Sequence, residues 1–323
     1  MSGSDAHARP IAVYGAVIAN TGIAIAKFVA AALTGSSAML SEGIHSVVDT
    51  GNQGLLLLGI RRSKAPPDED HPFGHGKELY FWSLVVAVVL FGVGGGLAIY
   101  EGVIHVLEPV HIEDPFVTYV VLALAFVLEA GSFTVAVREL LKEANGHSLI
   151  HTLRYSKDPS LPTVLFEDSA ALIGLVAAFL GILLAQITGD PRFDGVGSLV
   201  IGAVLAVVAV VLAYESRGLL IGERAEPELI EQVRATATAH PGVARVVDVR
   251  TMHVGARRVI VNLRVAFNGD RKSDVEAAIA KLHESLDQID GGLLDVTIEP
   301  VTADAAPIAA VDNSDAIGET AGE

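Results

Sequence analysis

The chain has 323 residues, 51% of them hydrophobic, and its mean hydropathy is positive. This composition is typical of an integral membrane protein that also carries about one small soluble domain. The absence of cysteine excludes disulfides and thiolate metal sites, so metal ligands must come from His, Asp, Glu, Asn or backbone oxygens. The formal net charge of −16 argues against a nucleic-acid partner.

Six apolar stretches are each long enough to cross a lipid bilayer as a helix, which takes about 20 residues. They are Ile11–Leu33, Ser37–Ile60, Leu79–Val106, Pro115–Leu140, Thr163–Ile187 and Gly195–Tyr214. Residues 1–10 are polar and lack the basic segment and cleavage site of a signal peptide. We therefore expect a cytoplasmic N-terminal segment followed by a retained span.

Lysine and arginine gather on one side of this arrangement. The connections after the second, fourth and sixth stretches are rich in them, whereas the opposite-side connections hold only Arg192. By the positive-inside rule, both termini are expected in the cytoplasm. Arginine outnumbers lysine and alanine is abundant, from which we expect the inner membrane of a bacterium.

After Gly222 the hydrophobic pattern becomes that of a soluble domain. The periodicities follow an α-β-β-α-β order, which favours an open-faced α/β sandwich of a sheet and two helices. The expected elements are the helix Pro227–His240, the strands Val243–Met252 and Arg258–Phe267, the helix Ser273–Ile289 and the strand Leu293–Val301. We expect a transmembrane domain at residues 11–215, a cytoplasmic domain at 216–302 and an acidic, disordered tail at 303–323.

His45 and Asp49 are four residues apart inside the second apolar stretch, a spacing that places both side chains on one face of a helix. Ionisable groups at membrane depth cost about 3 kcal/mol or more each, so the pair indicates an ion or proton pathway. One nitrogen and one oxygen ligand suit a divalent cation such as zinc. A buried ion pair or a local kink is the alternative explanation.

Glu167 and Asp168 are adjacent carboxylates in the fifth stretch. Neighbours on a helix point about 100° apart, so we expect one to face an ion and the other a different partner. A wet interface without a metal role would also accommodate both. Glu129 and Asn20 are further polar candidates inside spans. For these two, a hydrogen bond within the bundle is an equal alternative to metal ligation.

The connection after the second stretch concentrates Asp68, Asp70, His71 and His75 among prolines and glycines. This cluster is either an ordinary surface loop, a second metal site on the cytoplasmic side, or a funnel that guides ions to the membrane.

These motifs together resemble the cation diffusion facilitator family. The resemblance lies in His45-Ser-x-x-Asp49, the loop Asp68-x-x-His-Pro-Phe-Gly-His-Gly-Lys-x-Glu78, the six spans, the C-terminal domain, Asn20, Lys27 and Gly35-Ser-Ser-Ala38. It implies a homodimer in the bilayer that exports zinc or a similar divalent ion from the cytoplasm in exchange for protons. It also implies a tetrahedral transport site from the second and fifth spans and a ferredoxin-like domain that dimerises. The matching ligands are His45, Asp49 and Asp168.

One position departs from the family pattern. The fifth span of most members carries His or Asp four residues before the matching Asp, but here that position is Val164, which cannot ligate. The run Glu-Asp-Ser-Ala-Ala-Leu resembles instead the branch that includes the zinc-transporter-like proteins of mitochondria and their bacterial relatives. Water, Glu167 or Asn20 would then complete the ligand shell. Such an oxygen-rich site suits Mn²⁺ or Fe²⁺ as well as Zn²⁺.

Two further sets of residues match positions that bind metal in some relatives. Asp68, His71 and His75 match a loop site, for which a structural role is an equal alternative. His240 and His253 lie near positions of paired metals, but Asn262 and Glu299 stand where further histidines are expected. We therefore expect surface or hairpin histidines there rather than a two-metal centre.

Two functions remain open at this point. The first is a proton-coupled metal antiporter. The second is a non-transporting metal sensor or dimer partner, with Val164 marking a degenerate site. We expect no enzyme, because no nucleophile, phosphate loop or cofactor motif accompanies Glu167 and Asp168.

Overall fold

A computed structural model describes residues 21–110, 115–144, 157–256, 258–269, 272–289 and 294–308, together with residues 148 and 152. Asn20, a candidate ligand, lies outside the described residues. The chain divides into two compact units, Met1–Ile221 and Gly222–Glu323.

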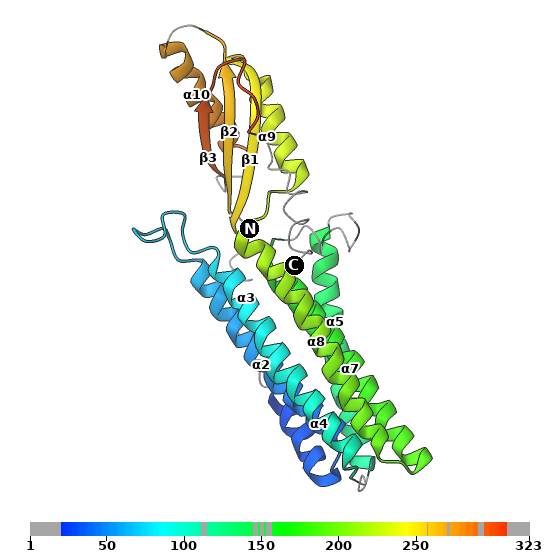
Figure 1. Ribbon diagram of the computed structural model, residues 1–323. Coiled ribbons are helices and arrows are strands. Elements are labelled where there is room, and N and C mark those ends of the chain that lie inside the picture. The colour runs from blue at the N-terminus through cyan, green and yellow to red at the C-terminus, as the bar shows by residue number, and fades with distance from the viewer. Residues whose placement is uncertain are drawn as a thin grey trace, which may run out of the picture. The chain divides into compact units, whose positions relative to one another are not determined.

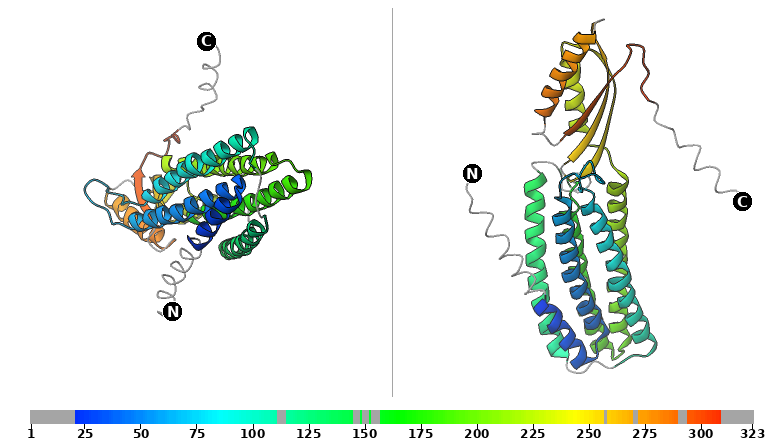
Figure 2. Two further views of the ribbon diagram at one scale, coloured as in Figure 1. Left: turned by 90° about the horizontal axis from the view of Figure 1, so that it is seen from below. Right: turned by 90° about the vertical axis from the view of Figure 1, so that its left-hand side faces the viewer.

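The first unit is a bundle of long helices that lie side by side (Figures 1 and 2). Its elements are the helix Thr21–Thr34, α2 (Ser37–Ser63), α3 (Glu78–Val89), the π-helix η1 (Leu90–Gly95), α4 (Gly96–Leu107), α5 (Pro115–Ala144), α7 (Ser160–Thr188) and α8 (Arg192–Ile221). Here α3, η1 and α4 run on as one span, Glu78–Leu107.

Four described helices are long and apolar enough to cross a membrane, namely Glu78–Leu107, Phe116–Lys142, Ser160–Thr188 and Arg192–Ile221. The helix Thr21–Thr34 is the described part of the first expected span. α2 covers the second expected span, and the polar residues of its buried face lower its mean hydropathy. The predicted membrane protein with a helical bundle and a C-terminal α/β domain is confirmed.

Glycines allow α8 to approach its neighbours closely. A Cβ atom added to Gly102 of α4 would lie 2.8 Å from the carbonyl oxygen of Gly195, and one added to Gly202 would lie 2.9 Å from that of Gly95. Small residues of this kind bring helix backbones together in a bilayer, where van der Waals packing drives association. The tight α8 contacts fix one wall of the bundle.

A buried carboxylate at the start of α8 fixes the beginning of α2. Asp194 accepts hydrogen bonds from the Ser36 hydroxyl at 2.6 Å and the Ser37 hydroxyl at 2.9 Å, and also one from the Ser37 backbone N–H. Ser36 itself caps the helix by accepting from Met39 N at 3.2 Å. A negative charge at a helix N-terminus is favourable, so Asp194 holds in place the helix that carries His45 and Asp49.

The second unit contains α9 (Pro227–Ala239), β1 (Val243–Gly255), β2 (Arg258–Phe267), α10 (Lys272–Asp287) and β3 (Leu294–Pro300). The sheet order is β1-β2-β3, with β1 and β2 antiparallel and β2 and β3 parallel. Both helices pack on one face of this sheet (Figure 2). Alternating Val261, Leu263 and Val265 of β2 form the centre of the core. The predicted α-β-β-α-β order is confirmed.

The boundaries of this unit differ from the expected ones. α8 continues to Ile221, and Gly222 follows it with a φ of +113°, so the chain divides after 221 rather than after 215. Residues 303–308, expected in the disordered tail, are held on the sheet because arginines donate to their carbonyls. The bonds are Arg245 to Ala305 at 2.6 Å and Arg264 to Ala306 at 2.9 Å. Residues 309–323 lie outside the described residues.

Candidate functional site

α2 presents an imidazole and a carboxylate to the interior of the bundle. His45 Nδ1 and Asp49 Oδ1 are 3.4 Å apart, one helical turn from each other, and His45 is only 1% exposed. Neither ring nitrogen of His45 nor Oδ1 of Asp49 makes a hydrogen bond within the described residues. Leaving buried polar atoms without hydrogen bonds costs about 1–3 kcal/mol each, so these atoms are suited to receive a cation.

The adjacent carboxylates of α7 point to different helices. Glu167 Oε1 accepts a hydrogen bond from Asn52 Nδ2 of α2 at 2.7 Å. Asp168 Oδ2 accepts one from the Ser132 hydroxyl of α5 at 2.8 Å. The angle of about 100° between neighbours on a helix explains the divergence. Glu167 therefore lies on the side of His45 and Asp49, and Asp168 lies on the α5 side.

Val164 has a packing role. It lies one turn before Asp168 and belongs to an apolar cluster with Ala136 and Leu140 of α5 and Leu165 of α7. The α7 face that carries Asp168 and Val164 therefore contacts α5 rather than α2. This contact explains how an apolar residue is accommodated at a position where most of the family carries a ligand.

The bundle site, defined here as His45, Asp49, Glu167 and Asp168, concentrates negative charge. Asp49 interacts electrostatically with Glu167, Asp168 and also Glu129 of α5. Like charges in a low-dielectric interior repel strongly unless protons or a cation compensate them. The electrostatic arrangement thus favours a divalent cation or several protons in the middle of the bundle.

A buried ion pair next to the bundle site was not predicted from the sequence. Lys27 Nζ of the first helix donates to Glu42 Oε2 and to the Ser46 hydroxyl of α2, both at 2.8 Å, and both charged side chains are completely buried. The sequence signal for Glu42 was its position three residues before His45, on the same side of α2. Lys27 supplies positive charge near an otherwise acidic centre.

The bundle site is not gathered as tightly as a metal centre. Within the part of the chain that the structure describes, the only group of three His, Asp or Glu residues whose ligand atoms lie within 4.8 Å of one another is in the loop after α2. The bundle site instead consists of the contacting pair His45 and Asp49 and of two carboxylates that bond to other helices.

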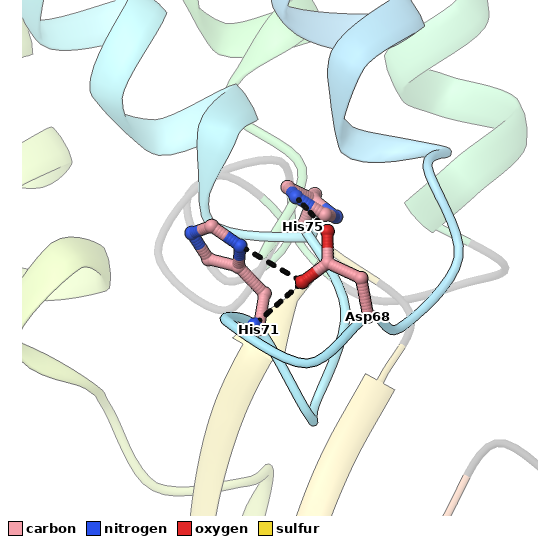
Figure 3. A group of neighbouring side chains, drawn as sticks. All are labelled: Asp68, His71 and His75. Atoms are coloured by element: carbon pink, nitrogen blue, oxygen red, sulfur yellow. Dashed lines mark hydrogen bonds and ion pairs between the residues drawn. The ribbon is translucent and has the colours of Figure 1, made fainter.

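The loop site consists of Asp68, His71 and His75 (Figure 3). His71 Nδ1 lies 3.2 Å from Asp68 Oδ1, and His75 Nε2 lies 3.3 Å from Asp68 Oδ2. The backbone N–H of His71 donates to Asp68, and this bond, with help from both imidazoles, lowers the pKa of the Asp68 carboxyl. Two imidazoles and an ionised carboxylate form a ligand set that fits zinc. Asp70 is exposed and lies outside the group.

The histidines of the second unit have local roles. His240 Nδ1 accepts a hydrogen bond from Gly242 N at 3.2 Å, in the turn before β1. His253 is buried on β1, and Glu299 of β3 pairs with Arg264 at 3.4 Å. Across the described part of this unit, no three His, Asp or Glu side chains come close enough together to share a metal ion.

The model of the cation efflux transmembrane domain matches residues 13–221, more than half of the chain. The chain belongs to the cation diffusion facilitator family. The proton-coupled zinc antiporter SLC30A9, mitochondrial, of Mus musculus is 37% identical over 245 residues, which are 75% of this chain and 43% of that protein. Metal tolerance protein C4 of Arabidopsis thaliana is 31% identical over 236 residues, 72% of this chain and 52% of that protein.

Another relative carries the name of a different metal. The manganese efflux system protein MneP of Bacillus subtilis is 24% identical over 262 residues, 79% of this chain and 82% of that protein. The chain spans about half the length of the zinc and metal tolerance relatives named above. The mitochondrial relatives give the expected bacterial inner membrane no support.

Proposed function

We propose that this membrane protein carries a divalent cation, most simply Zn²⁺, out of the cytoplasm in exchange for protons. The observation that carries the proposal is the buried pair His45 and Asp49, whose ligand atoms make no hydrogen bond within the described residues and face further carboxylates. The relative of Mus musculus is named as a proton-coupled zinc antiporter, and that of Bacillus subtilis as a manganese efflux protein. Mn²⁺ and Fe²⁺ are therefore alternative substrates.

Coupling to protons follows from the chemistry of the bundle site. A metal ion requires neutral imidazole and ionised carboxylates, so binding releases protons and protonation releases the metal. His45 binds the ion only as neutral imidazole and the carboxylates bind it only when ionised, so these groups are the candidates for carrying the exchanged protons. Rocking of the bundle would expose the site to each side of the membrane in turn. In that cycle the carboxylates of the bundle site would give up protons as the ion binds and take them up as it leaves.

The remaining parts of the proposal concern the surroundings of the site. The bias of lysine and arginine supports a cytoplasmic position for both termini and for the loop after α2. The loop site would then collect the ion before it enters the bundle. Membership in the family supports a homodimer, with the second unit as its dimerisation domain.

Metal flux through variants of α2 tests the proposal. Purified protein in liposomes that contain a metal-sensitive dye is compared with His45→Ala and Asp49→Ala, with a pH gradient imposed. We expect both variants to lose gradient-driven uptake while remaining folded and monodisperse. The control is Val47→Ala, because Val47 is 52% exposed on another face of the same helix. Undiminished flux in either site variant contradicts the assignment.

A further inference from the structure

Asn52 is a buried amide that the family pattern does not account for. It lies on α2 three residues after Asp49, is 1% exposed, and donates from Nδ2 to Glu167 Oε1 over 2.7 Å. Its other polar atom, Oδ1, is also buried and makes no hydrogen bond within the described residues. The NH₂ group of Asn52 therefore joins α2 to α7, whereas its carbonyl oxygen has no hydrogen-bond partner among the described residues.

The hydrogen bond to Glu167 orients the amide of Asn52. The NH₂ group of Asn52 faces Glu167, so its carbonyl oxygen points elsewhere. Residues 45, 49 and 52 are spaced four and three apart, which places them on one face of α2. The unused oxygen of Asn52 thus lies on the helix face that carries the unbonded atoms of His45 and Asp49.

We propose that Asn52 sets the metal specificity of the bundle site, with Oδ1 as a neutral oxygen ligand and Nδ2 holding Glu167 toward the ion. This inference rests on the proposed transport function. In this arrangement His45, Asp49, Asn52 and Glu167 surround the metal, while Asp168 stays bonded to Ser132. In this set Asn52 and Glu167 take the places of Val164 and Asp168, the two positions of the fifth span that correspond to ligands in the family pattern.

Such a ligand set has a chemical consequence. It contains one nitrogen and three groups that bind through oxygen, one of them an uncharged amide. Oxygen ligands suit Mn²⁺, whereas imidazole favours Zn²⁺ and similar metals. The site would consequently accept both Zn²⁺ and Mn²⁺, and the amide oxygen would contribute more to Mn²⁺ binding than to Zn²⁺ binding.

The test compares Zn²⁺ and Mn²⁺ dissociation constants of the full chain in detergent for three variants of α2. In Asn52→Leu the new side chain has a similar shape but lacks both polar atoms. This variant should weaken Mn²⁺ binding by about 10-fold or more relative to Zn²⁺ binding. Asn52→Asp retains an oxygen, and it should return the Zn²⁺ to Mn²⁺ ratio toward that of the wild type. The matched control is Gln53→Leu, which removes an amide from the next, partly exposed position and should leave the ratio unchanged.

If Asn52 had a purely structural role, Asn52→Leu would weaken the binding of Zn²⁺ and of Mn²⁺ in the same proportion. An unchanged ratio in Asn52→Leu, or a ratio in Asn52→Asp equal to that in Asn52→Leu, overturns the inference. His45→Ala is measured alongside to separate this failure from failure of the proposed function. If His45→Ala removes the class of bound metal that belongs to the bundle site while the Asn52 variants keep the wild-type ratio, the bundle site stands and only the role of Asn52 is refuted.

Discussion

Lys27 and Glu42 form a completely buried ion pair, with Nζ and Oε2 at 2.8 Å, that joins the first helix to α2. Breaking a buried pair by removing one partner leaves an uncompensated charge and costs about 3–5 kcal/mol, whereas removing both partners costs far less. We therefore expect Lys27→Met alone to destabilise the protein by about this amount. Combining it with Glu42→Gln should recover most of the loss. Unfolding of the detergent-solubilised protein measures the effect. A single variant as stable as the double variant would contradict it.

Gly174 of α7 lies against the same ion pair, because Glu42 Oε1 is the nearest atom to a Cβ added there. Gly174→Ala should displace the Glu42 side chain and lower both thermal stability and metal flux. Gly51→Ala serves as the control, since a Cβ at Gly51 of α2 meets nothing within 4 Å. Alanine there should be neutral or slightly stabilising, as alanine favours a helix over glycine by about 1 kcal/mol. Equal effects of the two substitutions would argue against the close contact.

The loop site should bind zinc separately from the bundle site. His71→Ala with His75→Ala is expected to remove one class of bound Zn²⁺ in equilibrium dialysis and to leave the class that depends on His45.

The hydrogen bond from the His71 backbone lowers the pKa of Asp68 below its ordinary value of 3.8. Asp68 therefore stays ionised and keeps stabilising the loop above pH 3.8, and this contribution is lost as the pH falls through the lowered pKa.

Protonation of Asp68 should therefore play no part in any loss of loop zinc between neutral pH and pH 5. Asp68→Asn should weaken zinc binding without moving the midpoint of its pH dependence. A midpoint that shifts in this variant would show that the carboxylate titrates in that range after all.

Val164→His distinguishes an intact site from a degenerate one. Val164 packs with Ala136 and Leu140 of α5, so an imidazole at this position would not point toward α2. We expect no large gain in zinc affinity, and a loss of stability of about 1–3 kcal/mol from overpacking. Isothermal titration calorimetry gives the affinity. A gain of tenfold or more, equal to about 1.4 kcal/mol, would instead favour the non-transporting sensor or dimer partner.

Much of the fold was accessible from the sequence, because apolar length defines a membrane span and alternating periodicity defines the second unit. Spacing along one helix was equally informative, and it paired His45 with Asp49. Relations between helices were not accessible. The divergence of Glu167 toward Asn52 and of Asp168 toward Ser132 depends on which helices pack against α7. The roles of lone polar residues in apolar runs, such as Glu42 and Asn52, depend on partners from other helices.

The central claim is proton-coupled metal transport, and flux into liposomes tests it most directly. Wild-type protein is reconstituted with a metal-sensitive dye inside, and uptake of Zn²⁺, Mn²⁺ and Fe²⁺ is followed with and without a pH gradient. The account predicts that at least one of these ions is taken up and that its uptake accelerates with the gradient. Because protons leave the liposomes in exchange, the outer solution should become more acidic. Well-folded protein that moves none of the three ions under either condition would contradict it.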